Sequence, residues 1–220
     1  MSVVANLDKL MREIPEHVKI VAVSKTIPVE TIFEAYLAGH RLFGENKSQE
    51  MISKQPLLPN DILWHFIGHL QTNKVKYISP FVEMIESVDS LKLLQEIDKQ
   101  AEKNGRVIKC LLQFHIATEE TKFGLDLQEA EAILESPEYH SLKHTRICGV
   151  MGMASFSDDM ALVRKEFRNL KTISEHLKNQ FFSNNPAFCE ISMGMTGDYQ
   201  VAIEEGSTII RIGTGIFGSR

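Results

Sequence analysis

The sequence predicts a single α/β domain, a closed (β/α)8 barrel that follows an N-terminal helix and spans residues 1–220. Eight short apolar runs recur along the chain, and helix-length segments separate almost every run from the next, as expected for parallel strands joined by helical crossovers. The number of units matches a barrel. A doubly wound open sheet is the rival fold, since it also uses alternating strand and helix units. The apolar runs are residues 18–25, 41–43, 63–67, 82–88, 107–114, 146–151, 188–193 and 208–212.

The first elements of the chain are a helix, a strand and a second helix. Apolar residues recur at helical spacing over residues 3–13 and stop before Pro15, so a helix precedes the first strand. Residues 18–25 are mainly β-branched and apolar, which is typical of a strand buried on both faces. Pro28 then falls in the first turn of an amphipathic helix that ends before Gly39.

The later helices are predicted from apolar periodicity and from the residues at their ends. Ser90 can cap a helix that Gly105 closes, and Asp126 with Glu129 forms a capping-box pattern. The helices are expected at about residues 46–54, 70–77, 91–104, 127–135, 159–179 and 197–205, with irregular surface segments at 55–61 and 180–187.

Composition and charge exclude several classes of function. The net charge is -5, so long-range attraction does not hold nucleic acid or an anionic membrane on this chain. The three cysteines, Cys110, Cys148 and Cys189, each lie in an apolar run without C-x-x-C spacing, which indicates buried, reduced thiols. No apolar run has the length of a membrane span, and the N-terminus is amphipathic, unlike a signal peptide. We therefore expect a cytoplasmic protein, and we expect a monomer.

Residues directly after the strands should meet at the carboxyl-terminal mouth of the barrel. Lys25 ends the first strand, where a partly dry setting disfavours the ammonium form of a lysine and frees its amine to attack an aldehyde. The alternative is a strand-end lysine that points into water.

The glycine-rich turn after the last strand is a candidate anion site. Glycines there allow backbone N–H groups to approach an anion, and barrels often bind phosphate after strands seven and eight. Ser192, Thr214 and the N–H groups of Gly213 and Thr214 form the predicted phosphate clamp. The alternative is that the glycines only make tight turns. We rank the helix start near Thr196 lower as an anion site, because the negative charge of Asp198 in its first turn already interacts with the helix dipole.

Arg211 lies inside the last strand. Side-chain alternation sends its neighbours Ile210 and Ile212 outward and directs Arg211 into the barrel. A buried guanidinium needs a partner. We expect a structural ion pair with a barrel carboxylate such as Glu190.

Several motifs together resemble one protein family: VAVSKTIP, FGENKSQE, WHFIGHLQTNK, SVDS, KFGL, SMGMTGDY and RIGTGIFGSR. In this order, and over nearly the whole chain, they are similar to the YggS/PROSC family of pyridoxal 5′-phosphate homeostasis proteins. The resemblance implies a single barrel like the amino-terminal domain of alanine racemase, with pyridoxal phosphate held as a Schiff base on Lys25. It also implies phosphate contacts at Ser192 and at Gly213 with Thr214, and an arginine, Arg211, that faces the pyridine nitrogen. The full cofactor-binding set is then Lys25, Asn46, Ser192, Met193, Arg211, Ile212, Gly213 and Thr214.

These implications favour a carrier over an enzyme. An arginine at the pyridine nitrogen disfavours protonation of the ring, which weakens the ring as an electron sink and leaves imine exchange unaffected. The chain also ends at Arg220, before the second domain that supplies a base in alanine racemase. We expect a protein of vitamin B6 and amino and keto acid homeostasis that hands the cofactor to pyridoxal phosphate-dependent apoenzymes.

Two other functions stay open at this stage. One is a fold-type III pyridoxal phosphate enzyme, racemase-like or decarboxylase-like, that takes a base from His69, His115 or Tyr199. The other is a cofactor-free barrel enzyme that uses Lys25 on a sugar phosphate. Lys122 is the one rival to Lys25 as the reactive lysine.

Overall fold

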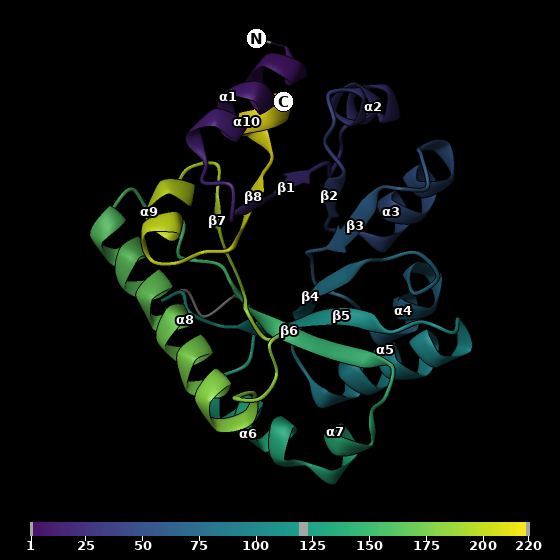
Figure 1. Cartoon of the computed structure of the whole chain (residues 1–220), viewed down its shortest axis with the longest axis vertical. Coiled ribbons are helices and arrows are strands. Elements are labelled where there is room, and N and C mark those ends of the chain that lie inside the picture. Colours follow the sequence, from purple (N-terminus) through teal and green to yellow (C-terminus); the bar gives the residue numbers. More distant parts are fainter. Residues whose placement is uncertain (1, 119–122, 219–220) are drawn as a thin grey trace.

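The computed structural model describes residues 2–118 and 123–218 and has the predicted closed barrel. Its parallel strands pair in sequence order from β1 to β8, and β8 pairs with β1 to close the barrel. In Figure 1 the strands lie at the centre and the helices lie around them. The strands are β1 Lys19–Val23, β2 Leu42–Glu45, β3 Leu63–Phe66, β4 Met84–Val88, β5 Ile108–Phe114, β6 Thr145–Gly152, β7 Glu190–Met195 and β8 Ile209–Ile212.

The helices confirm the predicted alternation and add three short pieces. All helices expected from periodicity are present, and α1 precedes the first strand. The α-helices are α1 Val3–Glu13, α2 Val29–Leu37, α3 Ser48–Lys54, α4 Thr72–Ile78, α5 Leu91–Lys103, α6 Leu127–Glu135, α8 Met160–Phe181 and α9 Tyr199–Glu204. The unpredicted pieces are the 3₁₀ helix η1 Gln55–Leu57 and the α-helices α7 Pro137–Ser141 and α10 Thr214–Phe217.

The predicted helix ends are confirmed. The hydroxyl of Ser90 accepts a hydrogen bond from the backbone N–H of Leu93 and caps α5. Asp126 and Glu129 form a reciprocal capping box at the start of α6. Gly105 has a φ of 61° after α5, a left-handed conformation that glycine adopts without steric cost.

Apolar side chains form two core clusters, one on each face of the barrel wall. The larger cluster lies between the strands and the helices and includes Ile210 and Ile212. The smaller cluster includes Val21 and Ile209 and fills the barrel interior. Because neighbours in a strand face opposite sides, Arg211 lies on the interior side with Ile209.

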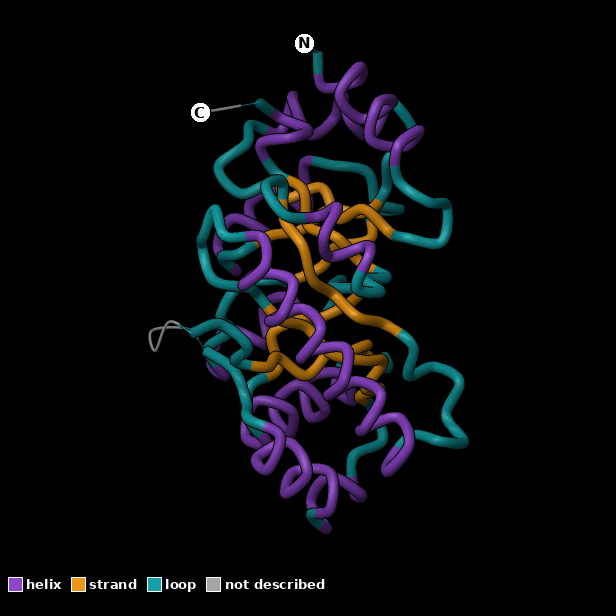
Figure 2. The backbone as a smooth tube through the Cα atoms, turned by 90° about the vertical axis from the view of Figure 1, so that its left-hand side faces the viewer, coloured by secondary structure: helices purple, strands orange, loops and turns teal. Residues whose placement is uncertain are grey.

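The two described ends of the chain lie together. Figure 1 shows α1 beside α10, and the side view in Figure 2 places both ends at the same end of the molecule. The Asn6 side-chain amide donates to the carbonyl oxygen of Ile216, which ties α1 to α10 over 2.9 Å.

One expectation about the thiols is wrong. Cys110 and Cys148 are buried, but Cys189 is exposed directly before β7. Burial raises the pKa of Cys148, so its thiol stays protonated at neutral pH. The described part of the chain contains no helix that is both long and apolar enough to cross a membrane.

Candidate functional site

A pocket of about 540 Å³ opens at the carboxyl-terminal ends of the strands. It contains five of the eight predicted cofactor-binding residues, which come from the ends of β1, β2 and β8. The residues that line it are Val23, Lys25, Asn46, Ile67, Met153, Ser155, Phe156, Ser157, Asp158, Met160, Met195, Thr196, Gly197, Asp198, Arg211, Gly213 and Thr214.

Lys25 lies half-buried in a tight turn between β1 and α2. The N–H of Ile27 donates to the carbonyl oxygen of Ser24 over 3.0 Å and closes the turn around Lys25 and Thr26. Thr26 has a φ of 62°, in the left-handed region that a β-branched residue rarely adopts. The turn that places Lys25 at the mouth of the barrel therefore contains one strained residue, Thr26, and strained residues are common at functional sites.

Arg211 reaches the pocket from inside the barrel and is only 4% exposed. Its guanidinium donates to the Ser192 hydroxyl over 2.6 Å and to the Gly152 carbonyl oxygen over 3.0 Å. The Glu86 carboxylate lies 4.0 Å away. Burial lowers the pKa of Arg211, and the negative charge of Glu86 opposes that change.

The expected partner of Arg211 was wrong. Glu190 pairs instead with Lys19, and it accepts a hydrogen bond from the hydroxyl of Thr208 over 2.7 Å. The reason is position along the barrel, because Glu190 begins β7 at the opposite end from the mouth, whereas Arg211 lies near the end of β8. Glu86 in the middle of β4 is the carboxylate that faces Arg211.

Glu86 links Arg211 to a histidine that the sequence did not single out. The Nδ1 atom of His65 lies 2.5 Å from Glu86 Oε1, and the Ser192 hydroxyl donates to Glu86 Oε2. Burial by itself would raise the pKa of Glu86, but the hydrogen bond and charge of His65, the charge of Arg211 and the Ser192 hydrogen bond lower it below its ordinary value. These four side chains form a buried polar network below the pocket.

Three predicted residues have side chains outside the pocket lining. The Ser192 hydroxyl is fully buried between Glu86 and Arg211. Met193 and Ile212 pack in the core between the strands and the helices, on the opposite side of the barrel wall from Ser192 and Arg211. None of the three is among the described residues that line the pocket, so their contact with a ligand stays a prediction.

Thr196 lies at the helix start that the sequence argument ranked below the glycine turn as an anion site. It lines the pocket together with Gly213 and Thr214, and its hydroxyl accepts a hydrogen bond from the N–H of Gly215. Asp198 lies at the N-terminal cap of α9, and its carboxylate accepts a hydrogen bond from the N–H of Met195. The signal was present in the sequence as a threonine at the end of a strand beside a glycine.

Asn46 is held at the border of the pocket by a close approach of two loops. A Cβ atom at Gly68 would lie 2.2 Å from the Asn46 carbonyl oxygen, so only glycine fits there. The side-chain oxygen of Asn46 is buried and has no hydrogen-bond partner among the described residues. Such an atom is costly unless a ligand or water supplies a donor.

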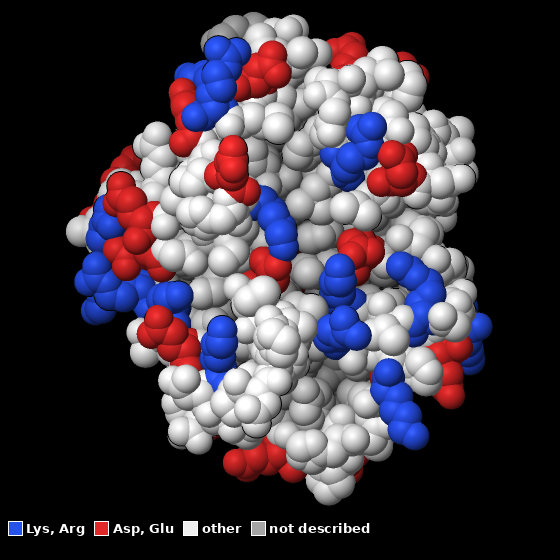
Figure 3. Space-filling model, viewed as in Figure 1, with Lys and Arg blue, Asp and Glu red and all other residues white. Residues whose placement is uncertain are grey.

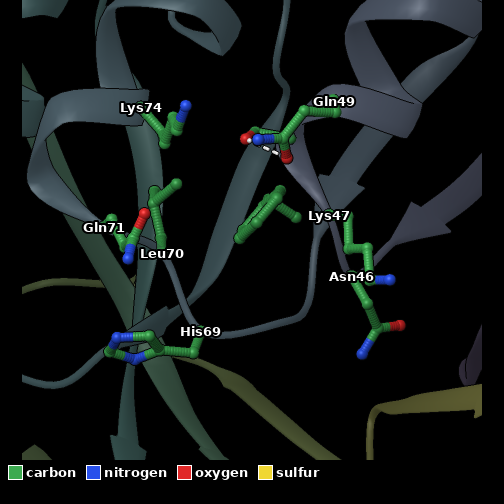
Figure 4. Close-up of a pocket in the computed structure, with 9 residues that line it drawn as sticks. Asn46, Lys47, Gln49, His69, Leu70, Gln71 and Lys74 are labelled. Atoms are coloured by element: carbon green, nitrogen blue, oxygen red, sulfur yellow. Dashed lines mark hydrogen bonds between the residues drawn. The ribbon is translucent and has the colours of Figure 1, made fainter.

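Asn46 also lines a second, smaller pocket of about 190 Å³ between the loops that follow β2 and β3. Figure 4 shows Asn46 and His69 on opposite sides of it, with Lys74 and Gln49 at its far end. His69 stacks on Phe123 with ring centroids 4.3 Å apart, and its Nδ1 atom lies 3.2 Å from Asp89.

The residues considered as an enzymatic base lie elsewhere. The larger pocket is lined, among the described residues, by none of the three candidates His69, His115 and Tyr199. Lys122, the rival reactive lysine, lies outside the described residues.

The charged surface is mixed. On the face in Figure 3, lysine and arginine side chains alternate with aspartate and glutamate side chains, without one continuous basic area. That face lacks the basic stripe typical of nucleic-acid-binding proteins. The expectation that nucleic acid is not a partner stays a prediction.

Comparison with known proteins identifies the family. The model of the family described as "Alanine racemase, N-terminal domain" matches residues 2–220. A protein of Aquifex aeolicus named "Pyridoxal phosphate homeostasis protein" is 42% identical over 204 residues, which cover 92% of this chain and 87% of that protein. The human protein of the same name is 38% identical over 214 residues, which cover 92% of this chain and 76% of that protein.

Solved structures agree. PipY of Synechococcus elongatus, in a structure described as having pyridoxal phosphate bound, is 36% identical, with a TM-score of 0.89 over 99% of this chain and 100% of that chain. The structure of PipY without the cofactor has a TM-score of 0.92. Alanine racemase from Bartonella henselae is 15% identical with a TM-score of 0.75 over 99% of this chain and 58% of that chain, which supports the fold alone. The chain therefore belongs to the alanine racemase N-terminal domain family and, within it, to the pyridoxal phosphate homeostasis proteins.

Proposed function

We propose that this protein binds pyridoxal 5′-phosphate in the 540 Å³ pocket, carries it as a Schiff base on Lys25, and serves intracellular vitamin B6 and amino and keto acid homeostasis. One observation carries the proposal: Lys25, Arg211 and the turn of Gly213 and Thr214 line a single pocket. The names of the relatives and the PipY structure with pyridoxal phosphate bound support it.

The residues of the pocket fit the functional groups of this cofactor. The cofactor supplies an aldehyde that condenses reversibly with amines. The Lys25 nitrogen would replace the aldehyde oxygen, which leaves as water, and addition of water would reverse the step. The turn of Gly213 and Thr214, with the Thr196 hydroxyl beside it, offers hydrogen-bond donors to a phosphate. The unpartnered oxygen of Asn46 can accept a hydrogen bond from a donor on the ligand or from water.

Arg211 explains why we favour a carrier over an enzyme. Its guanidinium is held from behind by Ser192 and Gly152, so it presents a fixed positive charge to the pocket. A positive charge facing the pyridine nitrogen disfavours a second positive charge on that nitrogen. Stabilisation of a carbanion by the ring would therefore be weak, whereas binding and release at Lys25 would not depend on it.

The absorbance spectrum of the purified protein tests the proposal. We expect the wild-type protein to turn yellow when mixed with pyridoxal phosphate and to lose that colour on borohydride reduction. We expect the Lys25→Ala variant to stay colourless at the same concentration. A wild-type protein that stays colourless, or a variant as yellow as the wild type, would contradict the proposal.

The family match also keeps an amino acid racemase-like or decarboxylase-like enzyme as a second candidate. The two functions differ in how fast the protein removes the α-proton of an amino acid. For a carrier we expect no exchange of that proton for deuterium above the rate with free pyridoxal phosphate. Fast exchange that depends on Lys25 would favour the enzyme.

We further propose that the protein is a monomer and that it passes the cofactor to pyridoxal phosphate-dependent apoenzymes. A mixture of the loaded protein with an apoenzyme tests the transfer. We expect activity to appear faster than the cofactor is released into buffer alone. Equal rates would mean that the apoenzyme captures only free cofactor.

A further inference from the structure

Lys54, at the end of α3, is buried beneath the turn that carries Lys25 and is only 7% exposed. Its amine donates to three oxygens. These are Glu45 Oε1 at 2.7 Å, the Ser24 carbonyl oxygen at 2.8 Å and Glu50 Oε2 at 3.1 Å. All three ammonium hydrogens are therefore used, and the charge faces two carboxylates.

These contacts lead to both residues that flank Lys25. On one side, the Ser24 carbonyl oxygen accepts from Lys54, and the Ser24 hydroxyl donates to Glu45 Oε1 over 2.8 Å. On the other side, the N–H of Thr26 donates over 2.6 Å to Glu50 Oε2, the same oxygen that Lys54 contacts. One ammonium group thus fixes the backbone before and after the reactive lysine.

The contact on the second side lies at the strained residue. Thr26 has a φ of 62°, and left-handed backbone is unfavourable for a β-branched residue. Its N–H is held in that conformation by Glu50, which Lys54 in turn orients. Without the contacts of Glu50 and Lys54, a return of Thr26 to an ordinary backbone conformation would lower the free energy. The Lys25 side chain would then change its direction as well.

We propose that Lys54 is a positioning residue for Lys25: through Ser24 and Glu50 it holds the strained turn so that the Lys25 amine meets the aldehyde. This inference rests on the proposed function. It assigns to Lys54 an effect on the covalent link and none on the affinity for the phosphate and ring, because Lys54 does not line the pocket.

A variant without this amine should still fold. Burial raises the pKa of Glu45, against the opposing hydrogen bonds from Lys54 and Ser24. When the ammonium is removed, the Glu45 carboxyl can take up a proton and avoid an unpaired buried charge. Methionine has nearly the same shape as the lysine stem, so Lys54→Met leaves no large cavity.

The test compares two ligands that differ in one group. Pyridoxal phosphate has the aldehyde, whereas pyridoxine 5′-phosphate has a hydroxymethyl group in its place and cannot form the link. The control variant is Lys19→Met, which breaks another lysine–glutamate pair; Lys19 begins β1, at the opposite end of the barrel from the pocket. Affinities for both ligands are measured for the wild type, Lys54→Met and Lys19→Met.

We expect Lys54→Met to bind pyridoxal phosphate about tenfold more weakly, the factor that corresponds to the strain of one left-handed residue. We expect its affinity for pyridoxine 5′-phosphate, and both affinities of Lys19→Met, to match the wild type. Equal losses for both ligands would mean general damage to the pocket and would overturn the proposal. An unchanged affinity for pyridoxal phosphate would overturn it too.

A second pair of variants keeps Lys54 in place. Glu50→Ala removes the acceptor of the Thr26 N–H, and we expect the same selective loss of pyridoxal phosphate affinity. Adding Thr26→Gly should restore part of that loss, because glycine adopts a positive φ without strain. A Thr26→Gly change that restores nothing would exclude the strained turn as the cause.

The wild-type arm separates this inference from the proposed function. Borohydride reduction followed by peptide mass spectrometry shows whether the wild-type Lys25 carries the label. A labelled Lys25 together with unchanged Lys54→Met affinities would overturn the role of Lys54 alone. An unlabelled Lys25 would overturn both.

Discussion

At the scale of single residues, the pocket combines the amine of Lys25, the buried guanidinium of Arg211 and the turn that begins at Gly213. Gly213 has no side chain at the point where the turn lines the pocket. A Cβ atom added there would meet nothing closer than 3.6 Å, from Val23, so the protein itself has room for a side chain. If glycine matters at this position, the reason is a ligand that approaches the backbone closely.

Gly213→Ala should therefore separate binding from folding. We expect its thermal stability to stay within the range of a neutral surface change, and we expect its affinity for pyridoxal phosphate to fall about tenfold through one displaced hydrogen bond to the phosphate. Pyridoxal, which has no phosphate, is the control ligand and should bind equally to both proteins. An equal loss for pyridoxal would show that the turn does not face the phosphate.

Glu86 predicts how stability depends on pH. Its pKa in the folded protein lies below the ordinary value, because the contacts of His65, Arg211 and Ser192 outweigh the effect of burial. A depressed folded pKa contributes stability that is present above the unfolded pKa, near 4.3, and that is lost as the pH falls through the folded pKa.

Urea unfolding of the wild type and of Glu86→Gln measures this contribution. At pH 7 we expect Glu86→Gln to be less stable by roughly 3 kcal/mol, because Arg211 loses its buried counter-charge. Between pH 5 and pH 3, the wild type should lose more of its unfolding free energy than the variant does. Parallel curves for the two proteins would show that Glu86 is not the group that titrates.

At the scale of elements, the strands were the most predictable part of the chain. Parallel strands buried on both faces appear in the sequence as continuous apolar runs, and each of the eight runs overlaps one of the observed strands. The short helices α7 and α10 were missed because helices of about one turn carry no periodicity. Ser136 and Pro137 at the start of α7 were the usable signal, since serine caps helices and proline fits their first turn.

For the site, the sequence predicts only the face of the barrel wall toward which a strand residue points. Alternation placed Arg211 correctly inside the barrel, because it depends on the strand alone. The choice of its partner depends on the level along the barrel axis, which the sequence of one strand does not contain. Thus Glu190 was expected where Glu86 is found. Lys54 escaped notice for the same reason, since its three contacts join β1, β2 and α3.

The capping box of α6 allows an element-scale test that is separate from the site. Asp126→Ala removes the acceptor for the Glu129 N–H and should reduce the unfolding free energy by about 1 kcal/mol. Gln128→Ala, at an exposed position of the same helix, is the matched control and should stay within about 0.5 kcal/mol of the wild type. Equal effects of the two changes would mean that the cap adds nothing.

At the scale of the whole molecule, one barrel builds the entire pocket from the ends of its own strands. The lining residues come from the ends of β1, β2, β3, β6, β7 and β8 and from the segments that follow them, which supports the proposal of a monomer. Sedimentation should therefore give one species near 24.9 kDa, with and without pyridoxal phosphate. A dimer that forms only with the cofactor would indicate that a partner completes the site.

The central claim concerns the amine of Lys25, and peptide mapping tests it most directly. The protein is loaded with pyridoxal phosphate, reduced with borohydride and digested, and the modified lysine is located by mass spectrometry. We predict a single reduced label on Lys25. A label on Lys122 or on another lysine, with Lys25 unmodified, would contradict the account.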